Sequence, residues 1–241
     1  MRGFFAAVGA GAALFLSGCA TAPDPSGAND PYESFNRKVF DLNRDVDRAV
    51  IKPVAQTYVD VVPEPARDGV HNFVTNLDLP ITFANDVLQG EAERGSETFL
   101  RFTINSTMGV GGLFDVATRN FHIPFHTEDF GQTLAVWGVD EGPYLVLPIA
   151  GPDPPRDAAG QVVDIFLDPW TYWPHFRSKF WWSAGETVLE GIDLRARNIE
   201  SLESIERQSI DLYASIRSLY RQNRNNEIRN GKPDVTNLPN L

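Results

Sequence analysis

The sequence has 241 residues, of which 42% are hydrophobic and 22% are charged, and its formal net charge is −11. This length and composition exclude a wholly disordered chain and allow one substantial domain, or two small ones, with a buried core. The negative charge excludes a general nucleic-acid binder, which needs a basic surface for phosphates, and argues against electrostatic docking on anionic lipid.

The charges are unevenly distributed along the chain. Residues 123–170 carry eight acids and one base, whereas residues 195–232 carry eight bases and five acids. Such blocks are either the solvated faces of helices, or an acidic mouth on this protein that faces a basic partner. Both interpretations stay open at the level of the sequence.

The N-terminus has the pattern of an export signal. After Arg2, the thirteen residues 4–16 carry no charge, a run that is too short to span a bilayer and suits a signal peptide. The next residues lead to Cys19, the only cysteine, in the sequence Leu-Ser-Gly-Cys, which looks like a bacterial lipobox. We therefore predict that residues 1–18 are a lipoprotein signal peptide and that Cys19 is the lipidated first residue of the mature chain. An ordinary signal peptide with a chance cysteine is the alternative.

The predicted lipidation sets the predicted location. Two acyl chains hold a protein stably on a membrane, and a lipobox cysteine normally carries three. Ala20 rather than Asp follows the cysteine, which favours the outer membrane over the inner one. We expect a protein that is lipid-anchored in the outer membrane on its periplasmic side, with residues 19–29 as a tether.

Most of the mature chain has the periodicity of amphipathic helices. We expect the first helix to begin at Asp30 as N-cap, with Pro31 and Glu33 in the first turn, and to end or kink at Pro53. A helix packed on a soluble core explains its apolar stripe, which comprises Phe35, Val39, Leu42, Val46 and Val50. Further helices are expected over residues 54–61, 66–77, 80–88, 91–107 and, as the longest, 186–224.

Two short motifs between the helices resemble ligand sites only superficially. The glycines at 109, 111 and 112 lack both the third glycine of a dinucleotide fingerprint and the Lys-Ser/Thr pair of a phosphate loop. A tight turn with close backbone packing explains them better. His122 and His126 have a spacing that suits zinc on a helix, but Pro124 lies between them. We interpret them as histidines of a surface loop, and we expect no cofactor.

Residues 129–157 form the most unusual stretch of the sequence. Nine of these residues are Gly or Pro, and two short apolar runs lie between them. Proline removes a backbone donor and glycine permits positive φ, so the stretch is neither a long helix nor a central strand. We interpret it as a stiff, irregular frame around a passage or gate.

A cluster of aromatic residues follows at 170–182, where seven of thirteen side chains are aromatic. Trp and Tyr collect where one end of the ring is apolar and the other wet, as at membrane interfaces. The cluster is either such an interface or an aromatic core; its interface candidates are Trp170, Tyr172, Trp173, Trp181 and Trp182. Residues 225–241 are expected to be a disordered tail, and no mature segment has the roughly 18 uninterrupted apolar residues of a membrane span.

Several motifs in order resemble the MlaA (VacJ) family of outer-membrane lipoproteins. They are DPYESFNRKVFDLN from Asp30, PEPARDGVHNFVTNL from Pro63, RFTINSTMGVGGLFDVA from Arg101, DFGQTLAVWGVDEGPYLVLPIAGP from Asp129 and RDAAGQVVD from Arg156. The resemblance implies one MlaA-like domain over residues 30–224, mainly α, with amphipathic helices in a ring around a channel. It also implies removal of mislocalised glycerophospholipid from the outer leaflet, beside a trimeric porin, with delivery to an MlaC-like periplasmic carrier.

The motifs suggest candidate residues for the wall and gate of such a channel, chosen because small and polar side chains suit a lumen. They are Asn105, Ser106, Thr107, Gly109, Gly111, Gly112, Gly131, Thr133, Gly138, Gly142, Tyr144 and Gly151. Two other functions stay open. One is a structural lipoprotein that braces a porin; the other is an envelope phospholipase, for which Ser106 and His122 form the best pair.

Overall fold

The computed structural model describes residues 29–172 and 179–232, with the side chains of 179–184 left out. In these ranges the fold is mainly helical, as expected, with a single two-stranded antiparallel hairpin. The elements are α2 (Glu33–Val46), η1 (Asp47–Ile51), α3 (Lys52–Val61), α4 (Glu64–Gln89), α5 (Ala92–Thr107), α6 (Val116–Phe121), α7 (Phe130–Val136), β1 (Val146–Leu147), β2 (Gly151–Pro152), α8 (Pro155–Leu167), η2 (Pro169–Tyr172), α9 (Lys179–Arg197), α10 (Ile199–Gln208) and α11 (Leu212–Ile228). The predicted signal peptide, Cys19 and most of the tether lie outside the described residues.

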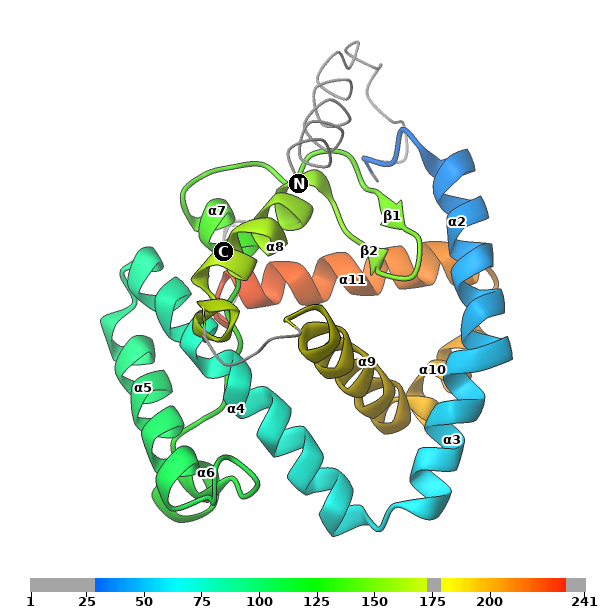
Figure 1. Ribbon diagram of the computed structural model, residues 1–241. Coiled ribbons are helices and arrows are strands. Elements are labelled where there is room, and N and C mark those ends of the chain that lie inside the picture. Colours follow the sequence, from blue (N-terminus) through cyan, green and yellow to red (C-terminus); the bar gives the residue numbers. More distant parts are fainter. Residues whose placement is uncertain (1–28, 173–178, 233–241) are drawn as a thin grey trace, which may run out of the picture.

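The helices follow a ring-like course. Figure 1 shows α2 and α3 along one side, α4 along the next, and α7, α8 and the hairpin closing the perimeter, with α5 and α6 outside α4. Helix α9 lies within this perimeter, where it packs against α3 and α4, and α11 crosses from the α2 side to α7. The ring therefore brings α4 and α9, which are far apart in sequence, face to face.

The first helix differs from its predicted form at both ends. Its N-cap is Tyr32, not Asp30. The Asp30 carboxylate is instead buried and accepts hydrogen bonds from Asn36, Tyr213 and Arg217. Of the two outcomes expected at Pro53, an end or a kink, the end is wrong: α2 passes through the π-helical η1 into α3. This widened turn precedes the proline, which cannot donate a backbone hydrogen bond.

Helix α4 is longer than predicted. Two helices were expected here, the second of them starting at Pro80. Instead α4 is one helix of 26 residues that continues through Pro80, and its C-cap is Gly90, whose φ is +80°. Tertiary contacts with α5, α7, α8 and α9 along its length stabilise the helix despite the interior proline. The predicted helix over 91–107 is confirmed as α5, with bounds shifted by a residue.

The single long helix predicted over residues 186–224 is wrong. The chain folds there into α9, α10 and α11, with breaks at Asn198 and at residues 209–211. Asp211 caps α11, because its carboxylate accepts a hydrogen bond from the backbone of Ala214. Residues 225–228 continue α11 and 229–232 follow it in a turn, so the disorder predicted for 225–232 is wrong, and residues 233–241 lie outside the described part.

Burial is inverted relative to an ordinary soluble domain. Among the described residues, 16 buried side chains are polar or charged and only 10 are apolar, Pro154 included, whereas 29 large apolar side chains are exposed. The stripe of α2 shows the effect: Val39 is buried, but Phe35, Leu42 and Val50 are each more than half exposed. The expectation that this stripe packs on a soluble core is therefore wrong. No helix in the described ranges is long and apolar enough to cross a membrane.

The basic and acidic blocks pair with each other within the chain. On α11, Arg224 binds Asp129 and Asp157, with N–O distances of 2.6 and 2.9 Å, and Arg221 binds Glu141 at 2.6 Å. We call these residues, together with the Arg217–Asp30 pair, the C-terminal clamp. Three acids of the first block are thus neither a solvated face nor a mouth for a partner; they hold the predicted frame onto α11.

Candidate functional site

Two adjoining cavities lie where α4 faces α5 and α9. The first has a volume of about 180 Å³ and is lined by His71, Asn72, Thr75, Asn76, Leu79, Arg101, Asn105, Asp115 and Phe125. The second has a volume of about 200 Å³ and is lined by His71, Val74, Thr75, Asp78, Thr82, Phe125, Thr127, Glu190, Asp193 and Leu194. Because His71, Thr75 and Phe125 border both, the two cavities are neighbours across these side chains. We call them the polar cavity and the acidic cavity.

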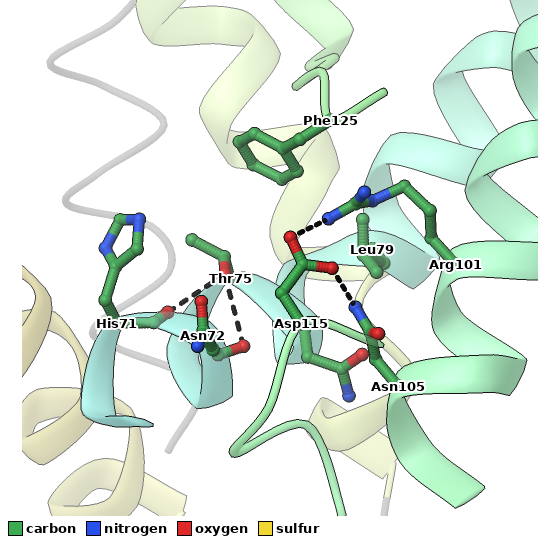
Figure 2. Close-up of a pocket in the computed structure, with 9 residues that line it drawn as sticks. His71, Asn72, Thr75, Leu79, Arg101, Asn105, Asp115 and Phe125 are labelled. Atoms are coloured by element: carbon green, nitrogen blue, oxygen red, sulfur yellow. Dashed lines mark hydrogen bonds and ion pairs between the residues drawn. The ribbon is translucent and has the colours of Figure 1, made fainter. Parts of the chain in front are cut away.

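The polar cavity is built on a buried arginine. Arg101 of α5 donates to the Thr118 hydroxyl and the Ile123 carbonyl, both at 2.6 Å, and pairs with Asp115 at 3.1 Å. Figure 2 shows Asp115 between Arg101 and Asn105, which also donates to it. Burial opposes the charged form of Asp115, but hydrogen bonds from Thr118, Asn105 and Arg101 outweigh burial and lower its pKa. On this wall Asp115 is therefore ionised, and Arg101 neutralises its charge.

The glycine-rich turn after α5 packs against Asn76 and Asn105, two residues of the polar cavity's wall. Gly109 has no space for a side chain, since a Cβ atom there would lie 2.3 Å from the Phe114 carbonyl oxygen. Gly112 has φ +94° and packs directly on Asn76, which in turn donates to Ser106 at 3.1 Å. The interpretation of this motif as a tight turn with close backbone approach is confirmed.

The acidic cavity holds carboxylates without partners. Asp78 on α4 and Glu190 on α9 make no hydrogen bond or ion pair with any described residue, whereas Asp193 pairs with His71 and Arg197, both at 2.9 Å. Burial first, and then repulsion from Glu190, Glu186 and Asp168, raises the pKa of Asp78 to about 7. Burial also raises the pKa of Glu190, although its side chain is exposed. Glu190 therefore lies on the solvent-accessible wall of the acidic cavity.

The amino-acid sequence matches a known family. The family model described as MlaA lipoprotein matches residues 28–227. The chain is 40% identical to the intermembrane phospholipid transport system lipoprotein MlaA of Escherichia coli K12, over 90% of this chain and 85% of that one. It is 35% identical to the protein of the same name from Haemophilus influenzae, over 91% and 88% of the two chains.

The chain belongs to the MlaA lipoprotein family. Its fold agrees with this assignment, since a solved structure described as the structural basis for maintenance of bacterial outer membrane lipid asymmetry superposes with a TM-score of 0.74. The two sequences are 39% identical, and the match covers 83% of this chain and 98% of the other. Uncharacterized proteins from Rickettsia, such as that of Rickettsia felis at 38% identity over 78% of this chain, also match. The recognition made from motifs is confirmed.

The MlaA-like motifs separate into residues at the cavities and residues away from them. Asn105 lines the polar cavity, and Ser106 and Gly112 contact Asn76 of its wall. The Thr107 hydroxyl donates a hydrogen bond to the Thr103 carbonyl in the exposed last turn of α5. Gly111 has a positive φ and open space around it. Asn105, Ser106 and Gly112 therefore lie at or next to the polar cavity. A role of these residues in a channel stays a prediction.

The frame residues of the MlaA motifs lie in packed structure. Thr133 is fully buried and bonded to Asn85 and Gln89, and Tyr144 packs against Val39 and Tyr213. Gly131 is enclosed by Arg224 and Asp157, and Gly142 with φ +77° lies on Pro155. Gly138 and Gly151 have positive φ with open space around them. None of these residues lines the two cavities, so in this structure they support the ring, and a part in gating stays a prediction.

The two histidines considered for zinc have different surroundings. His122 ends α6 with φ +57° and is exposed, as expected. His126 is not on the surface: its side chain is 11% exposed, and its Nε2 lies 3.1 Å from the buried Asp86 carboxylate and from the Thr98 hydroxyl. Among the described residues no three His, Cys, Asp or Glu side chains form a metal site.

The aromatic candidates are only partly described. Trp170 donates from its ring nitrogen to the Leu77 carbonyl of α4, which anchors η2 to the ring. Tyr172 is 61% exposed beside the exposed apolar residues of α8, namely Val162, Ile165 and Phe166. Trp173, Trp181 and Trp182 lie where no side chain is described.

Sequence analysis missed the residues that give the cavities their charge. Arg101, Asp78 and Glu190 were not among the candidates, nor were His71 and Phe125. One signal was present: Asp78 lies between Leu77 and Leu79, and Arg101 between Leu100 and Phe102. A lone charge within an apolar stretch of a helix marks a polar environment that the helix must face.

Proposed function

We propose that this protein is an outer-membrane lipoprotein that removes mislocalised glycerophospholipids from the outer leaflet through an amphipathic channel and passes them to a periplasmic carrier. It lies in the membrane on the periplasmic side, anchored through Cys19, and so maintains outer-membrane lipid asymmetry. The names of the Escherichia coli and Haemophilus influenzae relatives, both of a phospholipid transport system, support this proposal.

The inverted burial is the observation that carries it. A monomer in water rarely exposes so many large apolar side chains while its interior is mostly polar. On α2, α4, α5 and α8 these side chains suit the hydrocarbon of a lipid leaflet, and the polar interior suits a headgroup.

Physical chemistry explains the need for such a protein. Two acyl chains of a phospholipid carry about 30 CH₂ groups, so their exposure to water costs on the order of 25 kcal/mol. Escape into water is therefore very slow. A shielded passage with polar walls for the headgroup lowers this barrier without exposing the chains.

We further propose a trimeric porin as membrane partner and an MlaC-like carrier as acceptor, both from the family resemblance. The exposed apolar residues of α8 and η2 form the surface proposed to contact lipid or porin, whereas the acidic cavity lies between α4 and α9. In this proposal the protein moves lipid between these two partners and does not catalyse a reaction. In the described part of the chain the Ser106 hydroxyl accepts a hydrogen bond from Asn76, and no hydrogen bond joins it to His122.

Outer-leaflet phospholipid in living cells tests the proposal. Cells that lack the protein should label more strongly with a membrane-impermeant, amine-reactive reagent, and the wild-type chain should restore low labelling. Cys19→Ser should fail to restore it and should be lost from outer-membrane fractions. A knockout whose surface labelling equals that of the wild type would contradict a transport function.

Photocrosslinking distinguishes the two alternatives. A photoreactive residue at Thr75, which borders both cavities, should capture phospholipid in cells, and one at the exposed Ser96 of α5 is the control for simple membrane contact. A brace for a porin would give no lipid adduct at Thr75. A phospholipase would convert phospholipid to lysolipid in vitro, and Ser106→Ala would abolish that turnover.

A further inference from the structure

We propose that the paired cavities recognise a phospholipid headgroup that carries a primary ammonium group, and so favour zwitterionic aminophospholipid over anionic phospholipid. The inference rests on the proposed transport function and adds a preference for one class of lipid. It places the ammonium in the acidic cavity, whose lining includes Asp78 and Glu190, with the rest of the headgroup towards the adjoining polar cavity.

The polar cavity has unused hydrogen-bonding capacity. Asn76 and Arg101 are each 4% exposed and line the cavity. The Oδ1 atom of Asn76 and the Nε atom of Arg101 have no hydrogen-bond partner in the described part of the chain. Buried polar atoms without partners are costly, and a bound polar ligand that rearranges these side chains is one way to satisfy them. Such atoms on the wall of a cavity point to a polar occupant.

The acidic cavity has unneutralised charge. Asp78 from α4 and Glu190 from α9 face the same hollow, and Glu186 and Asp168 act on Asp78 with the same sign. The basic groups nearby are already engaged: Arg197 pairs with Asp68 and Asp193, and His71 also pairs with Asp193. An anionic headgroup would add a further negative charge here, whereas an alkylammonium would neutralise the carboxylates.

An ammonium fits the geometry better than a metal ion does. The described carboxylates do not converge in a group of three that could hold a metal. Separated carboxylates on two helices suit a larger cation with several N–H donors.

The two cavities adjoin, since His71, Thr75 and Phe125 line both. A polar headgroup held in this region therefore lies beside the carboxylates of the acidic cavity. A headgroup without the amine leaves those carboxylates unpaired.

Lipid retained by the purified protein tests the preference. The acylated full chain is reconstituted in vesicles of equimolar phosphatidylethanolamine and phosphatidylglycerol, extracted in mild detergent, and its bound lipid is measured by mass spectrometry. We expect wild type to retain phosphatidylethanolamine in roughly tenfold excess, the ratio that one neutralised charge contact produces. Asp78→Asn with Glu190→Gln should return the ratio to that of the vesicles without loss of total lipid.

A matched control removes the same charge elsewhere. Asp60→Asn with Glu200→Gln changes two exposed acids on α3 and α10 that make no ion pair in the described part, and it should keep the wild-type ratio. Equal retention of both lipids by wild type, or a ratio that survives the Asp78/Glu190 change, would overturn the preference and leave transport intact. Retention of no lipid by wild type would overturn both proposals.

Soluble ethanolamine distinguishes a lipid headgroup from a free amine. At the concentration of the vesicle lipid, ethanolamine should leave the retained ratio unchanged, because it lacks the phosphate and acyl contacts of the lipid. Loss of the preference at that concentration would overturn recognition of a lipid headgroup. Circular dichroism of each variant confirms that the helices are retained.

Discussion

Carboxylates have opposite surroundings in the C-terminal clamp and in the acidic cavity. In the clamp, Arg224 lies between Asp129 and Asp157, and each carboxylate has a guanidinium partner. In the acidic cavity, Asp78 and Glu190 have neither an arginine nor a lysine beside them in the described part of the chain. The clamp therefore holds the ring closed, whereas the cavity keeps uncompensated charge for water or a ligand.

The pKa values of the two regions reflect this difference. Burial opposes the charged forms of Asp129 and Asp157, but hydrogen bonds from Arg224 outweigh burial and lower both pKa values. Burial raises the pKa of Asp78 to about 7, and no cation opposes it. Removing a charged side chain should therefore destabilise the protein when that side chain belongs to the clamp, and stabilise it when it belongs to the acidic cavity.

The largest effect is expected for Arg224→Ala. It leaves the buried Asp157 and the partly buried Asp129 without their main partner, so the free energy of unfolding should fall by about 3–5 kcal/mol at pH 7. Urea unfolding of the purified protein in detergent measures it. The lowered pKa values mean that the clamp stabilises above about pH 4 and is lost as pH falls through the folded-state pKa values, so the deficit should shrink in acid.

Arg207→Ala is the control for the clamp. Its side chain is 70% exposed and its partner Glu203 is one helical turn away at 3.4 Å, so the loss should be under about 0.5 kcal/mol. Equal losses in the two variants would contradict the distinction between the clamp and ordinary surface pairs.

Gly160→Ala is expected to have the next largest effect. A Cβ at this position would lie 2.3 Å from the backbone nitrogen of Gly131, where α8 crosses α7 beside the clamp, so the helices must separate. The free energy of unfolding should fall by about 1–3 kcal/mol. Gly191 on α9 has open space around it, and Gly191→Ala should instead stabilise by about 0.5–1 kcal/mol. A neutral result at Gly160 would show that the crossing is not tightly packed.

Asp78→Asn tests the cavity side of the comparison. Because the folded state raises the pKa of Asp78, this side chain favours folding below about pH 4, and that contribution is lost as pH rises towards 7. The variant should match wild type in acid and exceed it by about 1–2 kcal/mol at pH 8, an upper range reduced for partial exposure to solvent. Thermal unfolding at both pH values measures it. A variant less stable than wild type at pH 8 would mean that Asp78 has a stabilising partner.

Local sequence signals predicted much of the fold. The helix over 91–107 and the turn at the glycine cluster were predicted because propensity, periodicity and glycine φ act over a few residues. The continuous α4 was missed because its contacts with α5, α8 and α9 outweigh the cost of Pro80. The breaks between α9, α10 and α11 were missed because the apolar period continues across them.

The candidate site was predicted less well than the fold. Asn105 was found at the polar cavity, whereas Thr133 and Tyr144 proved to be packed, because a Gly/Pro-rich sequence indicates irregular backbone but not what it encloses. The roles of Asp30 and Asp129 in the clamp depend on α11, which follows them in sequence by about a hundred residues or more. No local pattern contains that pairing.

The sequence by itself determined the amphipathic helices, the family and the predicted lipid anchor, because periodicity and motifs are properties of neighbouring residues. Only the tertiary structure decided which face of each helix points outward, since a stripe such as that of α2 has the same period whether it meets a core or a membrane. It also decided which charges are neutralised as the ring of helices closes: Arg224 pairs with its acids, whereas Asp78 has no ion pair in the described part of the chain.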